Sequence, residues 1–153
     1  MRRGEQQRIP VPPDTHHRQY LFGAYDWCDD TLCTQISERA NTATCLAFLE
    51  HLVMTTYPND LLVLVMDNAS YHKAAAVLAF FSLVEHRVLV LFLPAYCSHL
   101  NPIERFWRFL KDRACANTLF PDLPTLMTTV AHVLLQQNDL SDPHRFTFSK
   151  LEL

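Results

Sequence analysis

Two short, unbroken apolar runs constrain the possible folds of this chain more than any other feature. They are residues 61–66 (LLVLVM) and 88–93 (VLVLFL), followed directly by Asp67 and Pro94. Apolar runs of this length without polar alternation are typical of strands that are buried on both faces of a sheet. A helical pattern over residues 74–81 lies between them. We therefore predict two parallel strands that are joined by a right-handed crossover.

The other elements extend this pattern to an α/β layer fold. Residues 20–25 and 31–36 have strand composition and flank a turn, which predicts a hairpin. Asn41 is a good N-cap for a first helix. The apolar stripe of that helix consists of Cys45, Phe48, Leu49, Leu52 and Val53. Two further helical patterns begin near residues 101 and 123, and we find neither a repeat nor a second domain.

Composition fits one such domain and excludes several classes of protein. Of the 153 residues, 49% are hydrophobic, which is enough to bury a core. The two glycines, Gly4 and Gly23, cannot build a GxxxxGK[ST] phosphate loop or a GxGxxG dinucleotide turn. Five cysteines without a CxxC pair favour free thiols over disulfides or a zinc knuckle. Without an apolar run long enough for a bilayer or a signal peptide, we expect a cytoplasmic protein with no membrane partner.

Two acidic residues stand out by their position. Asp67 directly follows the first apolar strand, at the end where open α/β sheets place their ligands. Glu104 follows 37 residues later, in the first turn of the third helix. One helix, one strand and a loop fit between them, so both carboxylates can reach one edge and share Mg²⁺ ions that promote phosphoryl transfer. His72 and His99 are further candidate ligands, although a lone loop histidine is more often solvated or hydrogen-bonded.

On spacing alone, the positions of the same two acids can also be explained by purely structural roles. The segment NPIE from Asn101 to Glu104 has the pattern of a capping box, in which the glutamate reaches back to the cap. Asp67 and Asn68 could equally be turn residues before a helix capped by Ser70. The residues by themselves leave both interpretations open.

The third predicted helix combines basic and aromatic side chains. The residues that we predict to contact DNA are Arg105, Trp107, Arg108 and Lys111, with Phe109 and Arg113 beside them. This combination suits contact with a phosphate backbone and with unpaired bases. The net charge of −3 does not oppose this interpretation, because the local distribution of charge determines whether a surface attracts nucleic acid. The alternative is a solvated face on which Glu104 and Arg108 form an ion pair at i, i+4.

Two longer motifs carry a resemblance to a known family. LVMDNASYHK (residues 64–73) and LPAYCSHLNPIERFW (residues 93–107) resemble the DDE endonuclease domain of mariner-type insertion-sequence transposases, in order and in spacing. Residues 20–25 resemble the second strand of that family. The resemblance implies an RNase H-like mixed sheet flanked by helices and three acids that bind Mg²⁺ or Mn²⁺. It also implies hydrolysis at transposon ends and then attack of the freed 3′-hydroxyl on target DNA.

Position by position, the resemblance assigns roles to residues of this chain. Asp67 would be the second catalytic, metal-binding acid and Glu104 the third. The residues that would support this site are Asn68, His72, Asn101 and Pro102. A cap at residue 101 and a metal-binding role of Glu104 are compatible, because the cap can hold the helix start while the carboxylate faces the cleft.

The first acid of the family has no counterpart here. It lies on a central strand upstream of the strand that residues 20–25 resemble, whereas Asp14 lies in a Pro/His-rich loop and Asp26 at the far end of the hairpin strand. We therefore expect the C-terminal part of a transposase that lacks the first central strand. Its expected divisions are a Pro-rich lead-in (1–19), a partial endonuclease domain (20–137) and a C-terminal tail (138–153).

The lack of a first acid leads to expectations about activity and partners. Alone, the chain should have little or no strand-transfer activity. It should bind DNA at the nucleoid and associate with a second copy or with an upstream transposase fragment. The alternatives are a non-catalytic remnant that binds DNA or protein, and an RNase H-like nuclease with Asp26 as a relocated first acid.

Overall fold

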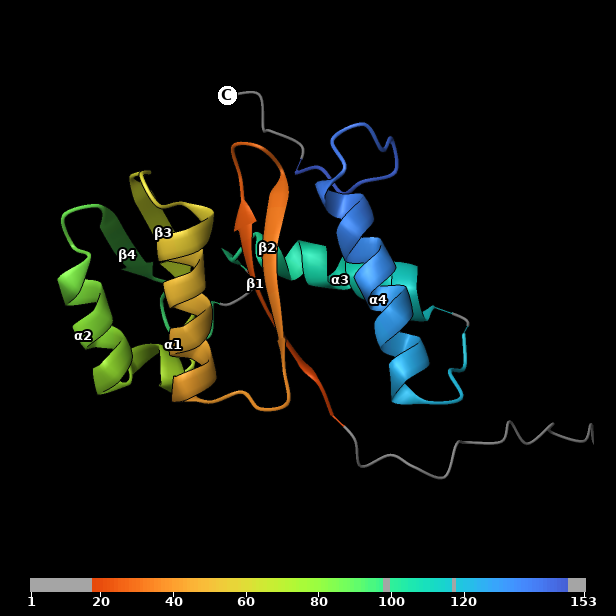
Figure 1. Ribbon diagram of the computed structural model, residues 1–153, viewed down its shortest axis with the longest axis horizontal. Coiled ribbons are helices and arrows are strands. Elements are labelled where there is room, and N and C mark those ends of the chain that lie inside the picture. The colour runs from red at the N-terminus through yellow and green to blue at the C-terminus, as the bar shows by residue number, and fades with distance from the viewer. Residues whose placement is uncertain (1–17, 98–99, 117, 149–153) are drawn as a thin grey trace, which may run out of the picture.

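Two separate two-stranded sheets form the framework of the computed structural model, which describes residues 18–97, 100–116 and 118–148 (Figure 1). The first is an antiparallel hairpin of β1 (Tyr20–Asp26) and β2 (Thr31–Ser37). The second is a parallel pair of β3 (Leu62–Met66) and β4 (Val88–Phe92). The predicted hairpin and the predicted parallel pair are both confirmed.

Helices connect and cover these strands. They are α1 (Thr42–His51), the π-helical turn η1 (Leu52–Thr56), the 3₁₀ turn η2 (Ser70–Lys73), α2 (Ala75–Leu83), α3 (Ile103–Cys115) and α4 (Leu123–Asn138). The predicted N-cap is confirmed, because Asn41 Oδ1 accepts from the Thr44 amide at 3.0 Å and Thr44 Oγ1 accepts from the Asn41 amide at 3.1 Å. In the described part of the chain, no helix is long and apolar enough to cross a membrane.

The side chains form two cores, on either side of the hairpin. One core joins α1 and α2 to the second sheet, and the five apolar residues predicted to stripe the first helix are all buried. The other core joins α3 and α4 to the hairpin around Phe106. β1 contributes to both, with Phe22 against the first core and Leu21 and Tyr25 against the second. In Figure 1 the hairpin accordingly stands between α1 and α4.

The second sheet is covered on one face only, so the prediction that its strands are buried on both faces is wrong. Alternate residues of β3 pack against the first core, namely Leu62, Leu64 and Met66. Val63 and Val65 between them are 62% and 42% exposed, and Leu89 and Leu91 of β4 are exposed as well. The cause is tertiary, because α1 and α2 both pack on the same face while α3 and α4 pack on the hairpin.

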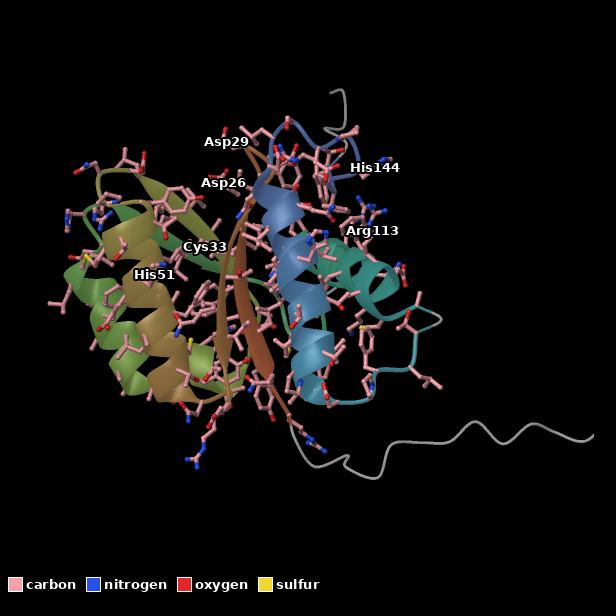
Figure 2. The ribbon with its side chains drawn as sticks, turned by 45° about the vertical axis from the view of Figure 1, so that its right-hand side comes forward. Asp26, Asp29, Cys33, His51, Arg113 and His144 are labelled. Carbon is pink, nitrogen blue, oxygen red and sulfur yellow. The ribbon has the colours of Figure 1, made fainter. Side chains whose placement is uncertain are left out.

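The segment after α4 folds back onto the tip of the hairpin. Figure 2 shows Asp26 and Asp29 at this tip, close to the segment that carries His144. Arg145 Nη2 donates to the Asp29 carbonyl at 3.1 Å, and the Phe148 amide donates to the Asp30 carboxylate at 3.1 Å. As far as Phe148, the predicted C-terminal tail is therefore packed against the domain.

The contacts between the hairpin tip and the segment after α4 form a clasp, and the polar side chain of Gln137 is buried at its centre. Its side chain is 1% exposed, and its Nε2 donates to the carbonyls of Asp30 and Phe146, each at 2.9 Å. Its Oε1 accepts from the Phe146 amide at 2.8 Å. One side chain thus satisfies three backbone groups that belong to two distant segments.

Replacing Gln137 with leucine should lower the free energy of unfolding by about 1–3 kcal/mol. The apolar side chain would leave both backbone groups of Phe146 without partners and the carbonyl of Asp30 with Arg145 Nη2 alone, and unsatisfied buried polar groups cost about that much. Urea unfolding measures the change. Gln136→Leu, one residue away, is the control and should change the stability by less than about 0.5 kcal/mol. Equal effects of the two variants would contradict the proposed role of the clasp.

Candidate metal and nucleic-acid site

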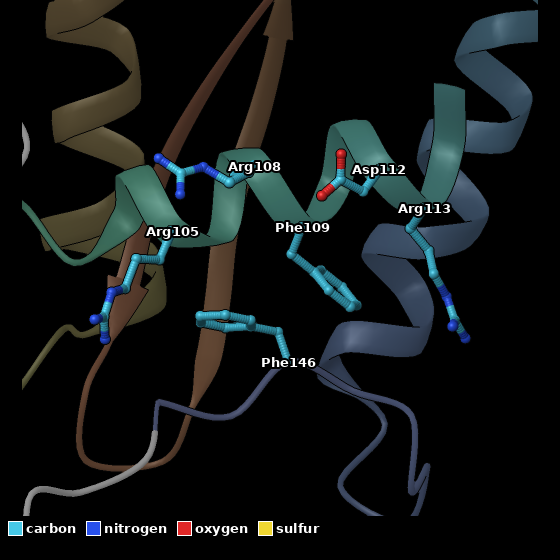
Figure 3. Close-up of a pocket in the computed structure, with 6 residues that line it drawn as sticks. All are labelled: Arg105, Arg108, Phe109, Asp112, Arg113 and Phe146. Atoms are coloured by element: carbon cyan, nitrogen blue, oxygen red, sulfur yellow. The ribbon is translucent and has the colours of Figure 1, made fainter. Parts of the chain in front are cut away.

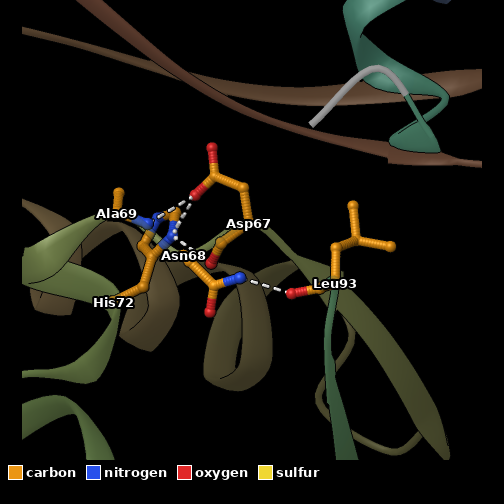
Figure 4. Close-up of polar contacts among 5 residues, drawn as sticks. All are labelled: Asp67, Asn68, Ala69, His72 and Leu93. Atoms are coloured by element: carbon orange, nitrogen blue, oxygen red, sulfur yellow. Dashed lines mark hydrogen bonds and ion pairs between the residues drawn. The ribbon is translucent and has the colours of Figure 1, made fainter. Parts of the chain in front are cut away.

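Asp67 is held at the carboxyl end of the parallel strand pair. It follows the last residue of β3, and its Oδ1 accepts from the Ala69 amide at 3.0 Å, which closes a tight turn. Asn68 Nδ2 donates to the carbonyl of Leu93, just after β4, and so ties the ends of the two strands together (Figure 4). The turn is thus anchored to both strands of the second sheet.

His72 binds one oxygen of the Asp67 carboxylate and leaves the other available. His72 Nδ1 lies 2.8 Å from Asp67 Oδ1, and the Asp67 side chain remains 38% exposed. Among the described residues, no group donates a hydrogen bond to Asp67 Oδ2. The charge of Asp67 also affects two nearby residues. The pKa of Tyr71 is raised mainly by burial and secondly by this charge, and the same two causes raise the pKa of Cys45 to about 11.

Glu104 lies in the first turn of α3, where the predicted capping box does not form. The N-cap is Pro102, which already has helical backbone angles (φ −54°, ψ −32°). Asn101 Oδ1 accepts instead from the Ile103 amide at 3.3 Å, and the Asn101 carbonyl accepts from the Glu104 amide at 3.0 Å. Because the helix starts one residue later than a cap at Asn101 requires, the exposed Glu104 carboxylate is not used for capping. The ion pair between Glu104 and Arg108, which belongs to the alternative interpretation of a solvated face, is absent among the described residues.

Apart from His72 beside Asp67, the described acids and histidines add no further member to a metal site at Asp67 or at Glu104. No group of three His, Cys, Asp or Glu side chains in the described segments is arranged to hold a metal ion. Asp14 and His99 lie outside those segments. Asp26 has structural partners, because Oδ1 accepts from the Cys28 amide at 2.8 Å and Oδ2 from the Tyr57 hydroxyl at 2.9 Å. Burial and this hydrogen bond raise the pKa of Tyr57.

The outer side of α3 is basic and borders an open hollow of about 400 Å³ (Figure 3). Its lining residues are Arg105, Arg108, Phe109, Asp112, Arg113 and Phe146. Figure 3 shows the rings of Phe109 and Phe146 between Arg105 and Arg113, and the ring centroids are 5.5 Å apart. Lys111 is exposed on the same helix. Sequence reasoning missed the contribution of Phe146, because nothing in the sequence shows that the last segment returns to α3.

Trp107 points away from this basic side and packs on β1. A Cβ atom added to Gly23 would lie 2.6 Å from Trp107 Cη2 and 2.8 Å from Cζ2. The indole therefore passes so close to the strand that only glycine leaves room for it. Trp107 is half-buried in the second core, unlike the exposed Arg105 and Arg108.

Gly23→Ala should therefore destabilise the protein by about 1–3 kcal/mol, the usual cost of forcing an extra methyl group into a packed contact. Thermal or urea unfolding measures it. In a double-mutant cycle, Trp107→Phe removes the outer indole ring and should relieve part of this cost. Additive effects of the two substitutions would mean that the contact does not constrain position 23.

A match to a family model identifies the protein family of this chain. Residues 1–127 match the family model described as DDE superfamily endonuclease. The chain belongs to the DDE superfamily endonucleases. This confirms the family resemblance that was drawn from the two motifs around Asp67 and Glu104.

Two curated relatives of this DDE endonuclease chain are longer proteins. The uncharacterized protein y4pE/y4sA of Sinorhizobium fredii is 30% identical over 80 residues, which cover 52% of this chain and 53% of the relative. The uncharacterized 39 kDa protein of insertion element IS630 from Shigella sonnei is 24% identical over 132 residues, which cover 86% of this chain and 38% of the relative. The chain thus spans between 38% and 53% of the lengths of these relatives.

A solved structure shows the fold class of the DDE endonuclease chain. The catalytic core domain of BIV integrase superposes with a TM-score of 0.51 at 16% identity, covering 74% of this chain and 73% of that chain. The expectation of an RNase H-like α/β fold is confirmed by this similarity.

Proposed function

We propose that this chain contributes two catalytic acids, Asp67 and Glu104, to an insertion-sequence transposase that cleaves and joins DNA. The observation that carries the proposal is the position of these acids within the family match. One directly follows β3 and the other lies in the first turn of α3. Both carboxylates reach solvent, and neither Asp67 Oδ2 nor the Glu104 side chain is engaged by a described residue.

The chemistry of these donors fits Mg²⁺ or Mn²⁺. Hard divalent cations bind oxygen, and Mg²⁺ commonly takes one or two carboxylates together with water and substrate phosphate oxygens. Asp67 and Glu104 would supply the carboxylates. When bound, such an ion activates a water or hydroxyl for attack on a phosphodiester and stabilises the leaving oxygen.

Neighbouring residues would position the two acids. His72 holds Asp67 Oδ1 and so orients the carboxylate with Oδ2 outward. Asn68 fixes the turn to the end of β4. Asn101 and Pro102 would determine where α3 starts and thus where its first turn presents an acid. These roles explain why polar residues surround the acids in both motifs.

The substrate of this proposal is DNA, both transposon ends and target, bound along the basic side of α3. The exposed cations Arg105, Arg108 and Lys111 would contact phosphates, and the aromatic rings of the hollow would contact bases. Trp107 is assigned to the same surface in the sequence-based prediction, but its packing on Gly23 favours a supporting role beneath it.

Neutralising the three cations should weaken DNA binding and lower its dependence on salt. In the variant Arg105→Gln/Arg108→Gln/Lys111→Gln, the slope of log K against log salt concentration should fall by about 1 for each lost phosphate contact. Fluorescence anisotropy with duplex DNA across a salt series measures the slope. Arg39→Gln, an exposed arginine before α1, is the control and should leave the slope unchanged. A slope that is the same in all three proteins would exclude α3 as the contact surface.

We also propose that the chain alone has little or no strand-transfer activity and works with a second copy or an upstream transposase fragment. Two acids without a third described ligand support this part of the proposal. The test is to incubate the purified 153-residue chain with DNA carrying the terminal repeats of its element, with and without Mn²⁺. Cleavage that depends on the metal would overturn the proposed lack of activity.

A non-catalytic remnant that binds DNA or protein is the second candidate. It is favoured by the same shortage of ligands among the described residues, and it requires neither Asp67 nor Glu104. Metal binding separates the two candidates.

A further inference from the structure

Tyr96 has a backbone conformation that is unfavourable for a residue with a side chain. It is the third residue of a four-residue turn after β4, which is closed by a hydrogen bond of 3.2 Å from the Cys97 amide to the Pro94 carbonyl. The φ angle of Tyr96 is 62°, whereas Ala95 before it has no positive φ. A turn with a positive φ at its third residue normally has glycine or asparagine there, because a Cβ atom destabilises this conformation.

A second strained residue shows how such a conformation is normally compensated. Among the described residues, Asp30 is the other non-glycine residue with a positive φ, 54°. Its carboxylate accepts hydrogen bonds from the Tyr25 hydroxyl and, at 3.1 Å, from the Phe148 amide. Tyr96 has no comparable compensation, because its side chain is 100% exposed. Packing therefore does not explain why an aromatic residue occupies this turn, and strain of this kind is typical of functional sites.

The turn that carries Tyr96 lies in the segment between the two proposed catalytic acids. Three positions before Tyr96, the Leu93 carbonyl accepts from Asn68 Nδ2, beside Asp67 (Figure 4). Eight positions after Tyr96, Glu104 lies in the first turn of α3. The turn is therefore tied at one end to the residues around Asp67 and leads at the other end to Glu104.

A cation lies at the same end of the parallel strand pair. Lys73 is exposed, and its Nζ lies 5.3 Å from the ring centroid of Phe92, the last residue of β4. The charge of Lys73 would attract a DNA phosphate. An exposed aromatic ring and a cation are the two kinds of side chain that hold single-stranded DNA, one by stacking on bases and the other by contact with the backbone.

We infer that Tyr96 contacts the DNA beside the two acids, by stacking its ring on an unpaired base next to the phosphodiester that is cleaved. The inference rests on the proposed function and adds a substrate-contacting residue to it. Within a duplex, the neighbouring pairs cover both faces of a base, so the ring can stack only on a base at a strand end or outside the helix. The strained turn would hold the ring in solvent before DNA binds, which reduces the entropy lost on binding.

Binding of two DNA probes tests this contact. One probe is a blunt duplex, and the other is the same duplex with a 3′ overhang of unpaired 2-aminopurine. Ca²⁺ is present in both titrations to offset the negative charge of the two acids. Tyr96→Ala should weaken binding of the overhang duplex by about fivefold or more and that of the blunt duplex by less than about twofold, because only the first offers unpaired bases. Tyr96→Phe, which keeps the ring, should bind both probes as the wild type does.

Tyr96→Gly separates this role from a structural one. Glycine adopts a positive φ without strain, so the melting temperature should be at least that of the wild type. The overhang duplex should nevertheless bind as weakly as it does to Tyr96→Ala. A lower melting temperature of Tyr96→Gly would mean that the side chain stabilises the fold, and it would overturn the inference.

The two probes also distinguish failure of this inference from failure of the proposed function. The comparison includes the variant Arg105→Gln/Arg108→Gln/Lys111→Gln, which should weaken binding of both probes. If it does so while Tyr96→Ala binds the overhang duplex as the wild type does, the Tyr96 contact is wrong and the proposed function stands. Equal weakening of both probes by Tyr96→Ala would exclude stacking on an unpaired base. If the wild-type chain binds neither probe, the inference and the proposed function are both wrong.

Discussion

Phe106→Ala should lower the free energy of unfolding by about 3–5 kcal/mol, the usual cost of truncating a fully buried phenylalanine. Its side chain is 0% exposed. The ring lies 6.4 Å from that of Tyr25 and 5.9 Å from that of Phe146, centroid to centroid. Phe106 therefore joins α3 to the hairpin and to the returning C-terminal segment at once. Three separate segments surround the site, so a small shift of one of them cannot fill the cavity.

Urea unfolding followed by circular dichroism measures this loss. Leu135→Ala is the matched control, because Leu135 is a large apolar residue on the exposed side of α4, where truncation should cost less than about 0.5 kcal/mol. Similar losses in the two variants would mean that the second core does not hold the domain together. Because α3 also carries Glu104 and the basic side chains, the stability of Phe106→Ala must be known before any binding defect is interpreted.

Asp67→Asn and Glu104→Gln should each weaken Mn²⁺ binding by at least about tenfold. Loss of a residue that only supports a metal ligand commonly costs 10–100-fold in affinity, and loss of a ligand should cost no less. An asparagine at position 67 can still accept hydrogen bonds from the Ala69 amide and from His72, so the turn should be kept. Electron paramagnetic resonance of free Mn²⁺ during titration measures the affinity.

The control for the metal experiment is Asp112→Asn. Asp112 is an exposed acid on the same helix as Glu104, but it lines the basic hollow. Its replacement should leave Mn²⁺ affinity within about twofold, since distant exposed charges are largely screened. If all three variants bind Mn²⁺ as the wild type does, the two acids are not metal ligands and the remnant interpretation is favoured.

Much of the local structure could be predicted from the sequence because it depends on neighbouring residues. The predicted N-cap of α1 at Asn41 depends on Thr44, which is only three positions away. The parallel pairing of β3 and β4 follows from two apolar runs separated by a helical segment. The position of Asp67 at the end of a strand follows from the first of these runs. In each case the relevant interactions lie within one element or between consecutive ones.

Of the predictions that failed, one concerns contacts between elements that are distant in the sequence and another concerns the exact start of a helix. An apolar run cannot indicate that α1 and α2 cover the same face of the second sheet, which leaves Val63 and Val65 exposed. The NPIE segment fits a capping box, but Pro102 is the N-cap and the helix begins at Ile103, one residue later than the box requires, which leaves the Glu104 carboxylate unengaged. Both differences matter for the proposed function, because they leave the Glu104 carboxylate without a capping role and one face of β3 exposed.

The sequence by itself determined the order and type of the elements, the family, and the positions of two acids, Asp67 directly after a strand and Glu104 in the first turn of a helix. Only the tertiary structure decided the direction of Trp107, the clasp around Gln137 and the division of the described strands into two sheets. The physical reason is that periodicity and capping record which side of an element is apolar and where it begins. Which other element covers that side depends on packing between segments as far apart as Asp30 and Gln137, and no local pattern contains that information.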